Sequence, residues 1–219
     1  WLAIEAASMR HADIDVFFVA LTGWGDMKPM VIWGLCIGAV LLLQRAWWPA
    51  LVWTLGTLTG NALMHSMKHG LGIERPHLTQ RIPDGFSFPS GHASMALVFM
   101  GLITALTWPR LSPRAKRLAL HGAALYVVMM TASRLYLGVH WTSDLLAGWA
   151  LGAAVVTLGW LLLQHAPTRM QPSLAKPHPL LIYLTTLLVW AIIGMTHIHA
   201  TLDTALWRYA PQLEESRAP

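Results

Sequence analysis

Charged residues are scarce in this 219-residue chain. Asp, Glu, Lys and Arg make up only 11% of it, whereas a soluble globular domain usually carries about 25%. Hydrophobic residues make up 55% of the chain, and the mean hydropathy is +0.50. Cysteine is nearly missing too. Cys36 is the single cysteine of the chain, so no internal disulfide can form. The composition therefore indicates a membrane protein rather than a soluble domain.

A concentrated basic segment is also lacking, although the formal net charge is +5. The basic residues stand at the ends of apolar runs, which is where membrane topology places them. The 12 tryptophans fit the same class, because indole rings favour the membrane–water interface. We therefore exclude nucleic acid as a partner. The chain opens at Trp1 without a signal-peptide pattern, so we expect a processed start or a piece of a longer protein.

Long apolar runs are what the sequence does have. A membrane-spanning helix needs about 20 mostly apolar residues. Six segments approach this length: 27–43, 49–67, 91–108, 118–136, 142–164 and 180–196. The sequence predicts an all-α fold, a polytopic membrane bundle of about six transmembrane helices. We expect residues 1–26 to form an amphipathic interfacial helix or a linker, and residues 199–219 to form a C-terminal tail.

The connections between these segments predict how the chain is oriented in the membrane. The most basic short connection is 109–117, which we place in the cytoplasm. The polar stretch 68–90 and the connection 137–141 then lie together on the opposite face. Three polar clusters meet on that face: "KHGLGIERP" from Lys68, "FPSGHAS" from Phe88 and "SRLYLGVHWTSD" from Ser133.

These clusters bring together the residue types that bind a phosphate. Lys68, Arg75 and Arg134 would repel one another unless an anion joined them, and the arginine fork matches phosphate oxygens. Ser90 is a good helix N-cap, and Gly91 lets a ligand approach the backbone. A helix N-terminus attracts anions through its free N–H groups. We predict a pocket for phosphate or a similar oxyanion.

Two histidines and a carboxylate add reactive groups to this pocket. His140 and Asp144 are spaced i, i+4, so a helix would place them one turn apart on one face. The carboxylate would hold one imidazole nitrogen protonated and leave the other as a nucleophile. His92 lies on another helix and could protonate a leaving oxygen. The set suits phosphoryl transfer through a phosphohistidine.

The three clusters, in this order and spacing, resemble the type 2 phosphatidic acid phosphatase (PAP2) family, whose fold is shared with vanadium haloperoxidases. The resemblance rests on Lys, six residues, Arg-Pro; on "PSGH"; and on Ser-Arg, five residues, His, three residues, Asp. It extends over roughly residues 25–197 and implies a PAP2-like transmembrane catalytic domain at 27–198. It implies no metal and no other cofactor. The implied catalytic residues are His140, His92 and Asp144, and the implied phosphate-binding residues are Lys68, Arg75, Ser90, Gly91 and Arg134.

The favoured function is removal of a terminal phosphate from a lipid phosphate or diphosphate. Undecaprenyl diphosphate, phosphatidylglycerol phosphate, phosphatidate and lipid A phosphates all fit, and the sequence does not choose among them. Two alternatives stay open: a lipid phosphotransferase using the same phosphohistidine, and a non-catalytic module that binds or transports an anionic lipid. A vanadate-dependent peroxidase fits a membrane-embedded chain less well. A zinc site at His65 and His69 is disfavoured, because no carboxylate or cysteine joins them.

The expected partners are the lipid substrate and the surrounding membrane lipids. The sequence makes no prediction of oligomeric state. We expect an integral protein of a bacterial inner membrane, with its active site facing the periplasm.

Overall fold

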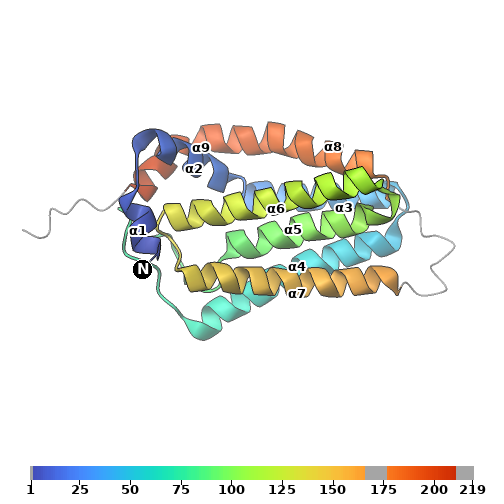
Figure 1. The fold of residues 1–219 in the computed structure, drawn as a ribbon, viewed down its shortest axis with the longest axis horizontal. Helices are drawn as coiled ribbons and strands as arrows, with labels where there is room; N and C mark the ends of the chain where they lie inside the picture. Colours follow the sequence, from blue (N-terminus) through green and yellow to red (C-terminus); the bar gives the residue numbers. More distant parts are fainter. Residues whose placement is uncertain (1, 166–176, 211–219) are drawn as a thin grey trace, which may run out of the picture.

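The computed structural model describes residues 2–165 and 177–210, and these form an all-α bundle of long helices lying side by side (Figure 1). The helices in chain order are α1 Leu2–Ser8, α2 Ala12–Gly23, α3 Met27–Leu43, α4 Trp47–Leu71, α5 Gly91–Thr107, α6 Pro113–Tyr136, α7 Thr142–Gln164, α8 Pro179–Val189 and α9 Met195–Tyr209. A 3₁₀ turn, Trp108–Arg110 (η1), extends α5, and a π-helical turn, Trp190–Gly194 (η3), joins α8 to α9.

All six predicted segments are helices of this bundle. The structure reproduces the predicted bounds of α3 and α7, whereas α4 starts earlier and ends later than 49–67. The last segment runs well past its predicted end at Thr196, because α8, η3 and α9 continue one another from Pro179 to Tyr209. Residues 166–176, between α7 and α8, and residues 211–219, the end of the expected C-terminal tail, lie outside the described residues.

Within the described residues, four stretches are long and apolar enough to cross a membrane: Gly91–Arg110, Pro113–Tyr136, Thr142–Gln164 and Pro179–Tyr209. A fifth candidate is Asp13–Gly23 taken together with Met27–Leu43, although the two parts are bent by 42°. Helix α4 is long as well, but polar side chains such as Asn61, His65 and Lys68 lower its apolar character. Many leucines remain exposed on the outer surface of the bundle, as expected where lipid is the solvent.

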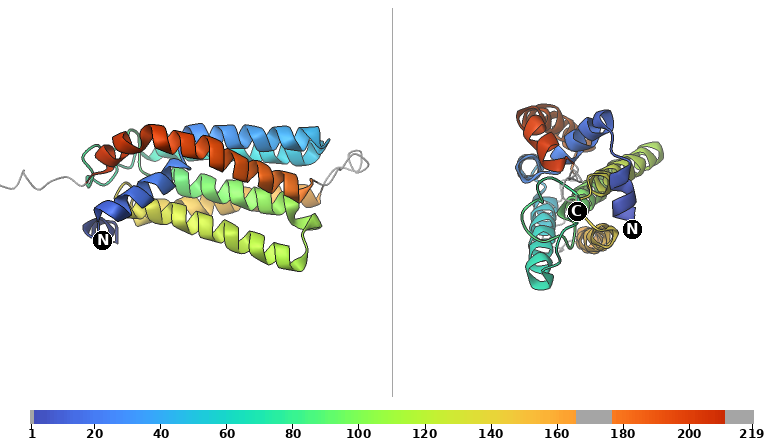
Figure 2. Two further views of the ribbon diagram at one scale, coloured as in Figure 1. Left: turned by 90° about the horizontal axis from the view of Figure 1, so that it is seen from above. Right: turned by 90° about the vertical axis from the view of Figure 1, so that its left-hand side faces the viewer.

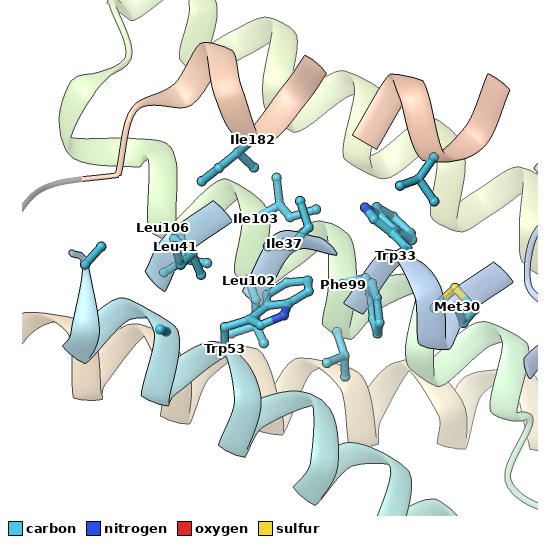
Figure 3. Close-up of a cluster of buried hydrophobic side chains, with 14 of the residues drawn as sticks. Met30, Trp33, Ile37, Leu41, Trp53, Phe99, Leu102, Ile103, Leu106 and Ile182 are labelled. Atoms are coloured by element: carbon cyan, nitrogen blue, oxygen red, sulfur yellow. The ribbon is translucent and has the colours of Figure 1, made fainter. Parts of the chain in front are cut away.

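Helix α5 is the centre of the bundle and packs against α4, α6 and α7. Its Phe99 and Leu102 are buried with Trp33 and Ile37 of α3 and Trp53 of α4 (Figure 3). The Trp33 indole donates a hydrogen bond to Thr186 of α8 (3.2 Å), so its polar atom is satisfied inside this core. The core holds α5 in place along its length.

The start of α5 lies against the start of α7. The Ser90 N–H donates to the Asp144 carbonyl (3.0 Å). Gly148, one turn further along α7, faces this junction, and a Cβ there would come within 2.9 Å of the Ser90 carbonyl oxygen. Glycine therefore allows the two helix starts to approach closely, which sets the spacing between the residues that precede each helix.

The loop 72–90 crosses the end of the bundle where α5 and α7 begin. Its backbone pairs with the end of α9, through Gln80 N–H to Ala210 O (2.7 Å) and Arg81 N–H to Arg208 O (3.2 Å). The Trp141 indole donates to the Glu74 carbonyl (3.0 Å) and ties the loop to the α6–α7 turn. Figure 2 shows α1, this loop and the end of α9 gathered at one end of the bundle.

Candidate active site

His140 and Asp144 form a buried pair at this end of the bundle. Asp144 lies in the first turn of α7, and His140 lies in the connection just before it. Their side chains are 2% and 0% exposed, and His140 Nδ1 lies 3.2 Å from Asp144 Oδ2. The predicted i, i+4 relationship is therefore present, although His140 precedes the helix rather than belonging to it.

The other nitrogen of His140 faces a guanidinium. Arg75 Nη1 lies 3.1 Å from His140 Nε2, and because a guanidinium only donates, Nε2 must accept. The proton of the neutral ring is then on Nδ1, toward Asp144. Burial, and next to it the positive charge of Arg134, lower the pKa of His140 well below its usual value of 6.5. The unliganded site thus holds a neutral imidazole with a lone pair on Nε2.

Asp144 receives two further hydrogen bonds on the same oxygen. The Ser87 hydroxyl donates to Oδ2, and the Trp141 backbone N–H donates to it at 2.8 Å. Ser87 is fully buried and also lies 3.4 Å from His140 Nδ1. This serine was not predicted from the sequence, and it fixes the carboxylate that orients the imidazole.

Lys68 and Arg75 hold the loop around this pair. Lys68 Nζ donates to the carbonyls of Phe86 (2.6 Å) and Ser87 (3.2 Å). Arg75 donates through Nε to the Gly85 carbonyl (3.1 Å) and through Nη1 to the Val139 carbonyl (3.0 Å). Burial, followed by the charge of Arg134, lowers the pKa of Arg75 to about 10, so it stays cationic at neutral pH.

Arg134 is buried near the end of α6. Its Nη1 donates to the Thr22 hydroxyl of α2 (2.7 Å) and to the Tyr209 hydroxyl of α9 (3.4 Å). Its guanidinium also lies 5.7 Å from the centre of the Tyr209 ring. Its Nε is buried without a hydrogen-bond partner among the described residues. Neither Thr22 nor Tyr209 was singled out in the sequence.

The start of α5 completes the site. Ser90 is the N-cap, as predicted, and its hydroxyl accepts from the Ala93 N–H at 3.5 Å. Gly91 is the first residue of the helix and His92 the second. His92 Nε2 lies 3.5 Å from a carboxylate oxygen of Asp26, which precedes α3. All eight predicted site residues therefore come from the same end of the bundle.

Comparisons with known proteins agree with this arrangement. A sequence profile of the PAP2 superfamily matches residues 47–168. Phosphatidylglycerophosphatase B of Bacillus subtilis is 31% identical over 150 residues, which cover 67% of this chain and 74% of that protein. The crystal structure of a transmembrane PAP2-type phosphatidylglycerolphosphate phosphatase from Bacillus subtilis superimposes with a TM-score of 0.69 at 26% identity, covering 76% of this chain and 85% of that one.

Two further relatives match over shorter stretches. An undecaprenyl-diphosphatase of Sulfolobus acidocaldarius is 31% identical over 104 residues, 48% of this chain and 47% of that protein. Phosphatidylglycerophosphatase B of Escherichia coli is 40% identical over 81 residues, 35% of this chain and 29% of that protein. This chain thus spans less than half the length of either.

The bundle and the buried site at its end define an integral membrane phosphatase. The chain belongs to the PAP2 superfamily.

Proposed function

We propose that this protein removes the terminal phosphate from a lipid phosphate or lipid diphosphate through a phosphohistidine on His140. The observation that carries the proposal is the orientation of His140 between Asp144 and Arg75. Its Nδ1 faces the carboxylate at 3.2 Å, and its Nε2 faces the guanidinium at 3.1 Å. A neutral imidazole held this way offers a nucleophilic lone pair on the side where cations gather.

In the first step, His140 Nε2 attacks phosphorus while the bond between phosphorus and the leaving oxygen breaks. His92 gives its proton to that oxygen, which leaves as the lipid alcohol, or as the lipid monophosphate when the substrate is a diphosphate. Asp144 stabilises the positive charge that develops on His140. Lys68, Arg75 and Arg134 balance the charge of the phosphoryl oxygens, and at the start of α5 the Ser90 hydroxyl and the Gly91 backbone N–H add donors.

In the second step, water attacks the phosphohistidine and the phosphorus–nitrogen bond breaks. His92, now neutral, takes a proton from this water, and inorganic phosphate is released. The enzyme returns to its starting protonation state. No metal takes part in the proposed scheme, because three cationic side chains supply the positive charge that the transferring group needs.

A lipid substrate is supported by where the site lies. It lies at the end of helices that are apolar enough to cross a membrane, which is where the headgroup of a membrane-anchored lipid is found. Two relatives are named for phosphatidylglycerophosphate and undecaprenyl diphosphate, and both of these compounds are lipids that carry a terminal phosphate. We place the site on the face opposite the basic loop 109–117, which is the periplasmic face in a bacterial inner membrane.

The test is phosphate release from a panel of lipid phosphates and diphosphates, by purified protein in detergent with EDTA. We expect release by the wild type and background release by His140→Ala, with both proteins folded. Release by His140→Ala at the wild-type rate would contradict the phosphohistidine. Release that requires an added lipid alcohol, with the phosphate recovered on that alcohol, would identify a phosphotransferase instead.

A further inference from the structure

Asp26 lies between two histidines that come from opposite parts of the chain. Its Oδ1 lies 3.5 Å from His92 Nε2, and its Oδ2 lies 2.9 Å from His197 Nε2 on α9. The side chains of His92 and His197 are 18% and 14% exposed, whereas the Asp26 side chain between them is 38% exposed. Asp26 and His197 both lie outside the segment that matches the PAP2 superfamily, residues 47–168.

The local structure of Asp26 shows that its carboxylate is not needed by its own helix. Asp26 is the N-cap of α3, where an aspartate usually accepts a hydrogen bond from a backbone N–H of the first turn. Here its side chain makes no such bond and is turned toward the two histidines. The histidine contacts therefore occupy a carboxylate that could otherwise stabilise the start of the helix.

The backbone beside Asp26 is also packed directly on the His92 ring. A Cβ at Gly25 would lie 2.5 Å from His92 Cδ2, a distance that no side chain could accept without displacing the ring. The loop between α2 and α3 therefore fixes where the imidazole lies. His92 Nε2 makes no hydrogen bond within the described residues, so the Asp26 carboxylate faces it as a nearby charge at 3.5 Å.

We propose that Asp26 is a positioning residue for His92 and that His197 in turn holds Asp26. The carboxylate faces His92 Nε2, so in the proposed scheme Nδ1 is the nitrogen that gives its proton to the leaving oxygen. The negative charge of Asp26 favours the protonated imidazole from which that proton is given. The site then has two carboxylate–histidine pairs, with Asp144 orienting the nucleophile and Asp26 orienting the acid. This inference rests on the proposed function of His92.

The contact with His197 gives the last helix a role in the site. His197 Nε2 donates to Asp26 at hydrogen-bond distance. It lies one turn beyond Gly194, where the π-helical turn ends, and such turns are frequent at functional sites. Gly194 is packed against the Trp24 indole, which leads directly into the Gly25–Asp26 loop. Through these two contacts, the last helix keeps the loop at Gly25 and Asp26 packed against His92.

The experiment compares Asp26→Asn with the wild type on two substrates that carry the same hydrocarbon chain. One is an alkyl phosphate, whose leaving oxygen needs a proton. The other is an aryl phosphate with an electron-poor phenol, which leaves without one. Loss of an acid or of its alignment should slow only the first substrate strongly. We expect Asp26→Asn to lower kcat about tenfold to 100-fold on the alkyl phosphate, with little change in KM and little loss on the aryl phosphate. His197→Gln should show the same pattern more weakly.

The matched control is Asp13→Asn in the first turn of α2, where the carboxylate is 95% exposed. It should leave both substrates unaffected. Equal losses on both substrates for Asp26→Asn, or unchanged kcat on both, would overturn the positioning role, because a purely structural contact between α3 and α9 does not distinguish leaving groups. If the wild type itself released no phosphate from either substrate, the proposed function would fail instead.

Discussion

Arg75 Nη1 lies 3.1 Å from Nε2 of His140, the imidazole nitrogen that does not face Asp144. In the unliganded protein the guanidinium thus covers the lone pair that the proposed reaction uses. An entering phosphoryl group must take this place, and its oxygens then become the natural partners of the same guanidinium. As the substrate binds, the Arg75 guanidinium would exchange its contact with His140 Nε2 for contacts with the phosphate oxygens. Substrate binding would thereby expose the Nε2 lone pair.

Arg75→Lys tests this exchange. Lysine keeps the charge but lacks the planar fork that can hold two phosphate oxygens. We expect KM for the lipid phosphate to rise at least about tenfold, as loss of one charge-assisted hydrogen bond of about 1.5–3 kcal/mol implies. Steady-state phosphate release gives KM and kcat. Arg81→Lys is the control, because Arg81 lies in the same loop and is exposed. An unaltered KM in Arg75→Lys would exclude Arg75 from phosphate binding.

Ser87→Ala tests whether the Ser87 hydroxyl holds Asp144 in the position that orients His140. The substitution removes the hydroxyl that donates to Asp144 Oδ2 and leaves the Trp141 N–H and His140 in place. A hydrogen bond to a charged group is worth about 1.5–3 kcal/mol, and about 1.4 kcal/mol corresponds to tenfold in rate. We expect kcat to fall about tenfold while KM changes little. Ser66→Ala on the exposed side of α4 serves as the control, and equal kcat in the two variants would mean that Ser87 has no part in orienting Asp144.

The contrast between Asp144 and Ser87 shows how far the sequence could predict this site. His140 and Asp144 are four residues apart, so local geometry alone places them together. Counting spans predicted that the three clusters share one face, and they lie at the same end of the bundle. The close agreement of α3 and α7 with their predicted bounds reflects clear apolar runs. The residues that were missed make contacts across 57 residues for Ser87 with Asp144, 112 for Thr22 with Arg134 and 171 for Asp26 with His197. Only the packing of the helices brings them together.

The lowered pKa of His140 predicts how stability depends on pH. Unfolded chains bind a proton at this residue near pH 6.5, whereas the folded, unliganded protein resists it until well below that pH. The unfolded state thus holds more protons as the pH falls below about 6.5, and the folded state loses stability there. His140→Gln lacks this titration. We expect the melting temperature of the wild type to fall relative to that of His140→Gln between pH 7.5 and 5, in detergent without phosphate. A constant difference between the two proteins across this range would show that burial does not keep His140 neutral.

Gly148→Ala tests whether the approach of α7 to α5 sets the spacing of the site. The added methyl group would meet the Ser90 carbonyl at 2.9 Å and the Ala93 Cβ at 3.1 Å, and a backbone carbonyl cannot turn aside as a side chain can. The starts of α5 and α7 must then separate, which carries His92 away from His140. We expect a loss of about 1–3 kcal/mol in the free energy of unfolding, together with a fall in kcat.

Gly122→Ala is the matched control, because a Cβ at Gly122 on α6 would meet no described residue within 4 Å. Alanine should stabilise that helix by about 0.5–1 kcal/mol and leave turnover as it is. Thermal unfolding in detergent and phosphate release measure the two effects separately. If Gly148→Ala behaved like Gly122→Ala, the distance between the helix starts would not control the chemistry. If it lost activity while keeping most of its stability, the reaction would depend on the relative position of His92 and His140 more finely than the fold does.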